Sequence, residues 1–196
     1  MSKNSCDTGD RPRVIVFDLD GTLWDPEMYQ LSGGAPFRPD EKNPDVAIDR
    51  INTKVSLIGE TRNVLQDLIV NPKWKDTYLA ISSTCDMPEW AESLLDLYKF
   101  KDTKGKMMPM VSLFSDRREI YYAGKDDQHK RILMKVRQID KSVNDFSQML
   151  FFDNQRNNVS TVSKLGVTCY YCPQGLVPGT FQKGLELWQK NNLASL

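Results

Sequence analysis

The chain has 196 residues, which predicts one domain with a substantial core and room for a small insertion. Its 26 basic and 26 acidic side chains cancel, so overall charge favours neither nucleic acid nor an anionic membrane as a partner. No apolar run approaches the ~20 residues that cross a bilayer. Residues 1–12 lack the apolar centre of a secretory signal and are interpreted as a flexible leader. These features predict a cytoplasmic protein, and they leave its oligomeric state open.

The cysteines and the single histidine do not suggest a metal site. Cys169 and Cys172 form a CxxC, but a zinc site needs more ligands and a redox CxxC normally opens a helix rather than lying in a strand-like run. We interpret both as reduced cysteines in or near a core strand. His129 lies in a charged helical segment and is expected on the surface.

The most informative stretch runs from Val14 to Trp24. Four apolar residues, 14–17, predict a buried strand, and Asp18 and Asp20 follow it with the same strand parity. Gly21 then ends the strand. Open α/β sheets keep their ligands at the carboxyl ends of their strands, so we expect an acidic site here.

Further strands and helices alternate along the rest of the chain. Apolar runs predict strands at 77–82, 110–114, 149–153 and 167–172, and helical spacing predicts helices at 60–70, 88–98, 126–139, before Gly166, and 181–190. This alternation predicts an α/β, Rossmann-like domain over 13–196 with a mainly parallel central sheet. Residues 25–58 carry little periodicity and several glycines and prolines, and we expect a small insertion there, a loop or β-hairpin near the acidic site.

Functional side chains follow three of the predicted strands. Asp18 and Asp20, Ser82 and Asp153 can therefore meet at one sheet edge, with Lys125 just before a helix. Carboxylates without histidine or thiol ligands suit a hard cation, most readily Mg²⁺. A hydroxyl, a lysine and helix N-terminal N–H groups suit a phosphoryl group.

This order of motifs resembles the haloacid dehalogenase (HAD) superfamily of phosphotransferases, over nearly the whole chain. The similarity is greatest to the eukaryotic magnesium-dependent, acid-phosphatase-like branch. The stretches that carry it are Phe17–Trp24, Arg118–Tyr121, Phe146–Asp153 and Leu165–Cys169.

The resemblance implies a role for each site residue. Asp18 would be the nucleophile that forms an aspartyl-phosphate, and Asp20 the general acid and base. The Mg²⁺ ligands would be Asp18, the Asp20 backbone carbonyl and Asp153. Ser82, Ser83 and Lys125 would bind the phosphoryl group. Trp24 and Asn154 are candidates for the substrate pocket, although Trp24 is equally compatible with the core.

The chain departs from that branch in four ways. Gly21 stands where the branch carries Tyr, Ser83 follows Ser82 where Arg is frequent, and Asn154 follows Asp153 where many members have a second Asp. The 25–58 insertion is also longer. These differences bear on substrate contacts and metal affinity.

The leading hypothesis is a Mg²⁺-dependent phosphomonoesterase acting on a phosphorylated small molecule or phosphoprotein. Phosphotyrosine, as in a protein tyrosine phosphatase, and sugar phosphates are both expected substrate classes. The alternative is a catalytically weak phosphoryl-binding or interaction protein on the same fold. A receiver domain is disfavoured, because its phosphorylated Asp ends a later strand than its acid pair.

Overall fold

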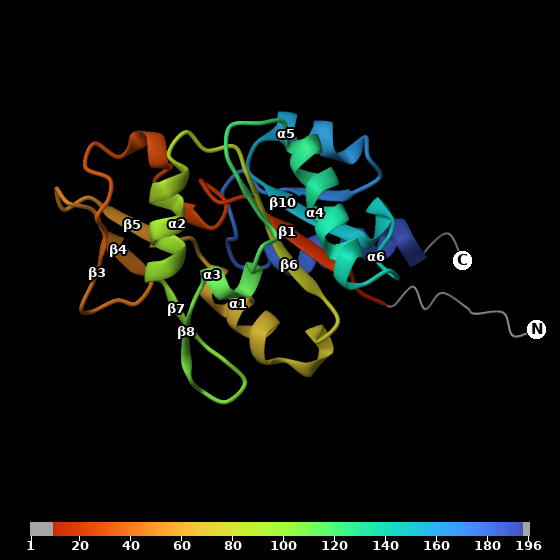
Figure 1. The fold of residues 1–196 in the computed structure, drawn as a ribbon, viewed down its shortest axis with the longest axis horizontal. Helices are drawn as coiled ribbons and strands as arrows, with labels where there is room; N and C mark the ends of the chain where they lie inside the picture. Colours follow the sequence, from red (N-terminus) through yellow and green to blue (C-terminus); the bar gives the residue numbers. More distant parts are fainter. Residues whose placement is uncertain (1–9, 194–196) are drawn as a thin grey trace, which may run out of the picture.

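The computed structural model describes residues 10–193 and has a five-stranded parallel sheet at its centre (Figure 1). The strand order is β11-β10-β1-β6-β9. These strands are β1 (Val14–Phe17), β6 (Tyr78–Ser83), β9 (Arg118–Ile120), β10 (Met149–Asp153) and β11 (Thr168–Tyr171). The predicted α/β class with a parallel central sheet is confirmed.

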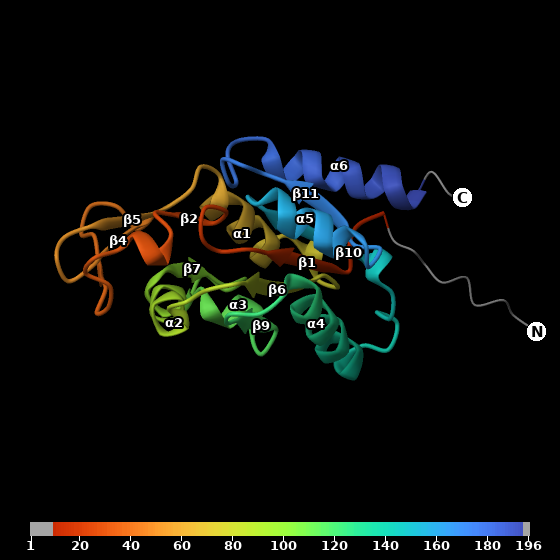
Figure 2. The same cartoon turned by 90° about the horizontal axis from the view of Figure 1, so that it is seen from above.

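Helices cover both faces of this sheet because its strands are apolar on both sides. In Figure 2, α6 (Thr180–Leu193) and α4 (Lys125–Ile139) lie on opposite sides of β1 and β10. The larger core contains Ile15 and Phe17 with α1 (Thr61–Val70), α2 (Pro88–Leu97), α3 (Val111–Phe114) and α6. The smaller core contains Val14 and Val16 with α4 and α5 (Arg156–Ser163).

The register of the sheet brings the carboxyl ends of three strands level. Phe17 pairs with Phe152 on one side and with Ile81 on the other, so the next residues, Asp18, Asp153 and Ser82, are neighbours. The chain passes from β1 outward through β6 and β9, and then returns to β10 on the other side of β1. This change of direction beside β1 is where open α/β sheets bind ligands.

Residues 24–57 form a second, antiparallel sheet at one end of the molecule (Figure 1). Its strand order is β2-β5-β4-β3, from β2 (Trp24–Asp25), β3 (Arg38–Pro39), β4 (Val46–Ile48) and β5 (Lys54–Leu57), and the short 3₁₀ helix η1 (Met28–Gln30) follows β2. Asp49 is buried in it and accepts hydrogen bonds from the backbone N–H groups of Gly34, Ile51 and Thr53. This carboxylate therefore fixes the turn between β4 and β5 and links it to the backbone at Gly34.

The prediction of a strand at 110–114 is wrong. Residues 111–114 form α3, with Met110, Leu113 and Phe114 buried at helical spacing, and the strand that joins the sheet is β9. Before α3, β7 (Lys99–Lys101) and β8 (Met107–Pro109) form a two-stranded hairpin that was not predicted. Two further 3₁₀ turns are η2 (Pro72–Trp74) and η3 (Phe146–Gln148).

The prediction of an exposed His129 is also wrong, because its side chain is fully buried in α4. Cys85, Cys169 and Cys172 are free thiols, and Cys6 lies outside the described residues. Residues 1–9 of the expected leader also lie outside them, whereas the carbonyl oxygen of Pro12 accepts a hydrogen bond from Thr77. Within residues 10–193, no helix has the length and apolar character to cross a membrane.

Candidate active site

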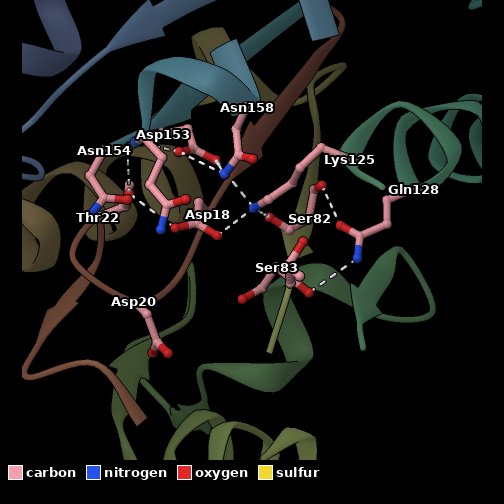
Figure 3. A network of polar contacts seen from close by, with 12 residues as sticks. Asp18, Asp20, Thr22, Ser82, Ser83, Lys125, Gln128, Asp153, Asn154 and Asn158 are labelled. Atoms are coloured by element: carbon pink, nitrogen blue, oxygen red, sulfur yellow. Dashed lines mark hydrogen bonds and ion pairs between the residues drawn. The ribbon is translucent and has the colours of Figure 1, made fainter. Parts of the chain in front are cut away.

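A buried lysine lies between two buried carboxylates at the carboxyl edge of the sheet (Figure 3). Lys125 Nζ lies 2.5 Å from Asp18 Oδ1 and 3.2 Å from Asp153 Oδ2. The ammonium also donates to the carbonyl oxygen of Ser82 at 2.5 Å. Lys125 is the first residue of α4, so the three groups come from β1, β10 and the start of that helix. One positive charge thus faces two negative ones, and all three side chains are buried.

Each carboxylate has further donors that fix its orientation. Asp18 Oδ2 accepts a hydrogen bond from the Thr22 hydroxyl at 3.3 Å. Both oxygens of Asp153 accept from Asn158 Nδ2, and Oδ1 also accepts from the Gln155 N–H at 2.6 Å. Burial, and then the charge of Asp18, raise the pKa of Asp153 to about 6. The site therefore has an excess of negative charge that a cation would relieve.

Asp20 lies apart from this cluster, where η1 meets β2. Its Oδ1 accepts from Trp24 Nε1 at 2.6 Å and its Oδ2 from the backbone N–H of Met28 at 3.0 Å. Burial raises the pKa of Asp20 to about 6, although both hydrogen bonds act in the opposite direction. A carboxyl group with this pKa is present in both protonation states near neutral pH, as a general acid and base requires.

Ser82 and Ser83 lie beside the cluster but are buried, and neither lines the cavity. The Ser82 hydroxyl donates to Gln128 Oε1 at 2.6 Å. Gln128 Nε2 in turn donates to the carbonyl oxygens of Ser83 and Tyr121. The side chain that follows these serines, Thr84, does line the cavity.

A cavity of about 270 Å³ opens above Asp18, Asp20 and Lys125. Residues in and just before the 3₁₀ turn η1, from the β6–α2 connection and from the start of α5 form its wall, among them Glu27, Met28, Tyr29, Cys85, Asp86 and Asn157. Trp24 is fully buried and stacks on Tyr98, and its Nε1 donates a hydrogen bond to Asp20. Asn154 also lies behind the cavity wall rather than on it.

Gly21 and Asn154 are adjacent in the structure. Gly21 has a φ of +71°, and a Cβ atom there would lie 2.2 Å from Asn154 Nδ2. The absence of a side chain at 21 thus provides the space that the Asn154 amide fills. Asn154 Oδ1 is buried and has no hydrogen-bond partner among residues 10–193.

The donor set fits a hard divalent cation. Asp18 and Asp153 supply two carboxylates that repel each other, and the unpartnered Asn154 Oδ1 is a further oxygen nearby. Within the described part of the chain, no three His, Cys, Asp or Glu side chains gather around one point. A cation here would therefore need backbone or amide oxygens beside the two carboxylates, and all-oxygen coordination is what Mg²⁺ prefers.

Three residues of the cluster were not predicted from the sequence: Thr22, Gln128 and Asn158. Thr22 belongs to the Asp-Gly-Thr motif, and its position four residues after Asp18 was the available signal. Gln128 follows Lys125 by three residues in a helix, so both lie on one face. The role of Asn158 depends on the turn after β10, which sequence spacing does not specify.

Comparisons with known proteins agree with this architecture. A model of the family described as Acid Phosphatase matches residues 10–191. Magnesium-dependent phosphatase 1 of Homo sapiens is 33% identical over 180 residues, covering 91% of this chain and 88% of its own. A HAD-like hydrolase superfamily protein of Schizosaccharomyces pombe is 32% identical over 157 residues, covering 80% of this chain and 83% of its own.

A solved structure shares the fold at low sequence identity. It is the N-terminal part of a Bacteroides fragilis protein containing a phosphatase domain, complexed with Mg, and it matches with a TM-score of 0.51 and 15% identity. The match covers 94% of this chain and 42% of that one. Together, the family match over residues 10–191 and the two relatives above 30% identity show that this chain belongs to the Acid Phosphatase family, of the HAD type.

Proposed function

We propose that this protein is a Mg²⁺-dependent phosphomonoesterase that acts through an aspartyl-phosphate on Asp18. The observation that carries the proposal is the placement of Asp18. Its carboxylate lies at the carboxyl end of β1, held by Lys125 and Thr22, and it opens onto the same cavity as Asp20. Asp18, which is held beside the ammonium group of Lys125, can attack phosphorus. Asp20, whose pKa is raised, can transfer the protons.

In the first step, a carboxylate oxygen of Asp18 attacks phosphorus and the bond from phosphorus to the leaving oxygen breaks. Lys125 offsets the repulsion between the carboxylate and the phosphate dianion. Asp20 donates its proton to the leaving oxygen. The raised pKa of Asp20 favours this transfer, because it keeps part of the population protonated near pH 6.

In the second step, water attacks the phosphorus of the aspartyl-phosphate. Asp20, now a carboxylate, accepts a proton from that water. The bond between phosphorus and Asp18 breaks, which releases phosphate and restores both carboxyl groups. Covalent catalysis of this kind replaces one difficult displacement by two easier ones.

The residues that would hold Mg²⁺ are Asp18, Asp153 and the backbone carbonyl of Asp20. When bound there, Mg²⁺ would supply positive charge that offsets the negative charge of the phosphoryl group. Asn158 and the Gln155 N–H keep Asp153 oriented for this role. Ser82 contributes through its carbonyl oxygen, which accepts a hydrogen bond from Lys125.

The cavity admits phosphotyrosine or a small sugar phosphate. Its volume, about 270 Å³, suits a phosphate with one ring attached, and the exposed ring of Tyr29 lies on its wall. Tyr29 could stack on an aromatic leaving group, whereas Glu27 and Asp86 could accept hydrogen bonds from sugar hydroxyls. A panel containing phosphotyrosine peptides and sugar phosphates separates the two classes by kcat/KM.

The central test is the Asp18→Asn variant, assayed with p-nitrophenyl phosphate in Mg²⁺. We expect activity to be lost while the circular dichroism spectrum is unchanged. Asp96→Asn provides the matched control, because Asp96 is an exposed carboxylate of α2 away from the cavity. EDTA should abolish the activity of the native protein, and added Mg²⁺ should restore that activity. Full activity of Asp18→Asn would rule out the aspartyl-phosphate.

A catalytically weak phosphoryl-binding protein on the same fold is the second candidate. It is favoured by Asn154, which adds an uncharged amide beside Asp153. Under this function, the purified protein binds phosphate or vanadate in the presence of Mg²⁺ but releases no phosphate from any member of the substrate panel. Turnover of a single panel member at a rate abolished by Asp18→Asn would exclude it.

A further inference from the structure

A second hollow lies away from the active site, between α1, the β7–β8 hairpin and the edge of the small sheet. Its volume is about 690 Å³, more than twice that of the active-site cavity. We call it the hairpin groove and define it by six of its lining residues: Pro44, Arg62, Val70, Phe100, Lys101 and Met107. The two hollows have no lining residue in common. The hairpin groove is therefore a separate feature of the molecule.

The walls of the groove are fixed by one arginine. Arg62 Nε binds Asp45, and its two Nη atoms donate to the carbonyl oxygens of Pro44 and Lys99 at 2.8 Å each. Its guanidinium also lies 4.6 Å from the ring centre of Phe100. Arg62 thus ties α1 to the small sheet and to the hairpin. A groove that is already formed costs a ligand little reorganisation.

The wall of the groove formed by β7 is also hydrogen-bonded to α1. Gln66 Nε2 donates to the carbonyl oxygen of Lys101 at 2.7 Å, and Gln66 Oε1 accepts from the backbone N–H of Lys101 at 3.0 Å. This side chain pairs with β7 as a neighbouring strand would. The hairpin is therefore held in place although it belongs to a sheet of only two strands.

Large apolar side chains are exposed in this hollow. Met107 is 54% exposed and Val70 is 41% exposed, and both line the groove with Phe100 beneath them. Single exposed apolar residues are common on proteins, whereas a contiguous apolar surface with a polar rim is typical of contact sites. The volume of the groove, about 690 Å³, is large enough to take an apolar side chain from another molecule.

The rim of the groove is basic. The hairpin exposes Lys99 and Lys101, which line the groove, and Lys104 and Lys106, which lie in the adjoining turn. Among the acidic residues that accompany them, Asp102 is bound by the backbone N–H groups of Lys104 and Lys106, and Asp45 pairs with Arg62. The side chains of Lys101, Lys104 and Lys106 make no ion pair with any residue from 10 to 193. Their charges remain available to an external anion.

We propose that the hairpin groove binds an extended acidic segment of a partner protein. An apolar side chain of that segment lies against Val70 and Met107, and its carboxylates face Lys101 and Lys104. The apolar floor favours a peptide over nucleic acid, because the phosphates of nucleic acid make no favourable contact with apolar side chains. The concave shape distinguishes it from a membrane, which is contacted by protruding apolar residues.

The test uses the full chain and a fluorescein-labelled peptide in which two leucines are spaced among glutamates. Fluorescence anisotropy should show saturable binding that weakens as NaCl is added. Lys101→Glu combined with Lys104→Glu should raise Kd by about tenfold. Met107→Asp should weaken binding by a similar factor, and it is expected to fold because Met107 is exposed.

Three matched controls accompany these variants. Lys164→Glu combined with Lys183→Glu makes the same double charge reversal at exposed sites outside the groove and should leave Kd unchanged. A peptide with lysines in place of the glutamates should not bind. Asp18→Asn should retain peptide binding, which separates this surface from the proposed catalysis.

Several results would overturn the proposal. These are equal binding of the lysine peptide, an equal loss of affinity in the control with Lys164→Glu and Lys183→Glu, or peptide-induced amide shifts in NMR spectra that map away from α1 and the hairpin. Binding of phosphatidylserine vesicles in the absence of peptide binding, abolished by the same lysine variants, would assign the surface to a membrane instead.

Discussion

The Ser82 hydroxyl donates its only proton to Gln128 Oε1, 2.6 Å away. The orientation of the Gln128 amide is fixed by Nε2, which donates to two carbonyl oxygens. If the amide were flipped, Oε1 would lie against these two oxygens, and an oxygen cannot donate a hydrogen bond to them. A phosphoryl oxygen is a hydrogen-bond acceptor and needs a donor. In this arrangement the proton of Ser82 is therefore directed toward Gln128 and not toward the substrate.

This relationship predicts that Ser82→Ala affects stability more than catalysis. The variant leaves Gln128 Oε1 buried without a donor, which costs about 1–3 kcal/mol of unfolding free energy. We expect kcat/KM to fall by less than about fivefold, since no direct bond to the phosphoryl group is lost. Urea denaturation and steady-state kinetics measure the two effects. Ser83→Ala is the control, because Ser83 is equally buried but uses only its carbonyl oxygen in this network. A large loss of kcat/KM at unchanged stability would show that Ser82 donates to the substrate.

Lys125→Met should abolish activity and make stability dependent on Mg²⁺. Without the ammonium, the buried carboxylates of Asp18 and Asp153 face each other unneutralised, which costs about 3–5 kcal/mol. Added Mg²⁺ should raise the melting temperature of the variant by more than that of the native protein. Lys130→Met, which removes an exposed lysine one turn along α4, should leave both properties close to native. Equal responses to Mg²⁺ would show that the cation does not bind at these carboxylates.

Local patterns were sufficient to predict the sheet and the positions of its acidic residues. Asp18 and Asp153 follow apolar runs that had to be buried strands, and parallel strands align their carboxyl ends. The run Met110–Phe114 was misinterpreted because four apolar residues out of five fit a buried helical turn as well as a strand. The contacts of Gln128 and Asp49 could not be predicted either. Gln128 donates to the carbonyl oxygen of Ser83 and Asp49 accepts from the N–H of Gly34, and in both cases the tertiary fold brings together partners that are distant in sequence.

The burial of His129 could not be predicted from its sequence neighbours either. It leads to a prediction about how the stability of the protein depends on pH. Its neighbours in sequence are charged, yet its ring is buried against Phe151, with centroids 4.4 Å apart, and its Nδ1 lies 2.7 Å from the carbonyl oxygen of Lys125. Burial lowers the pKa of His129 from 6.5 to about 3. The unfolded chain therefore binds a proton between these values that the folded chain does not.

The stabilisation from neutral His129 is fully present above pH 6.5 and is lost as the pH falls. Between pH 7 and pH 5 the loss is about 2 kcal/mol. His129→Phe, which fills the site without a titrating group, should lose correspondingly less stability over that range. Urea unfolding at both pH values gives the comparison within each protein, so any constant effect of the substitution cancels. The same pH dependence in both proteins would show that His129 does not contribute.

Gly34 determines how the small sheet packs on the main domain. Its φ is +65°, and a Cβ atom there would lie 2.1 Å from the ring of Trp90 in α2. Gly105 has a φ of +80° in the β7–β8 turn, with nothing within 4 Å of the corresponding position. The two glycines share a left-handed backbone but differ in their surroundings.

Substitution of each glycine by alanine therefore separates backbone strain from steric overlap. Gly105→Ala should cost about 1 kcal/mol of unfolding free energy through strain alone. Gly34→Ala should cost about 2–3 kcal/mol more, because the Trp90 ring must move. It should also lower kcat/KM, since the same insertion positions the Met28 N–H that binds Asp20. If the two variants lost equal stability in urea, the Trp90 contact would carry no packing energy, and the small sheet would not be anchored to α2 through Gly34.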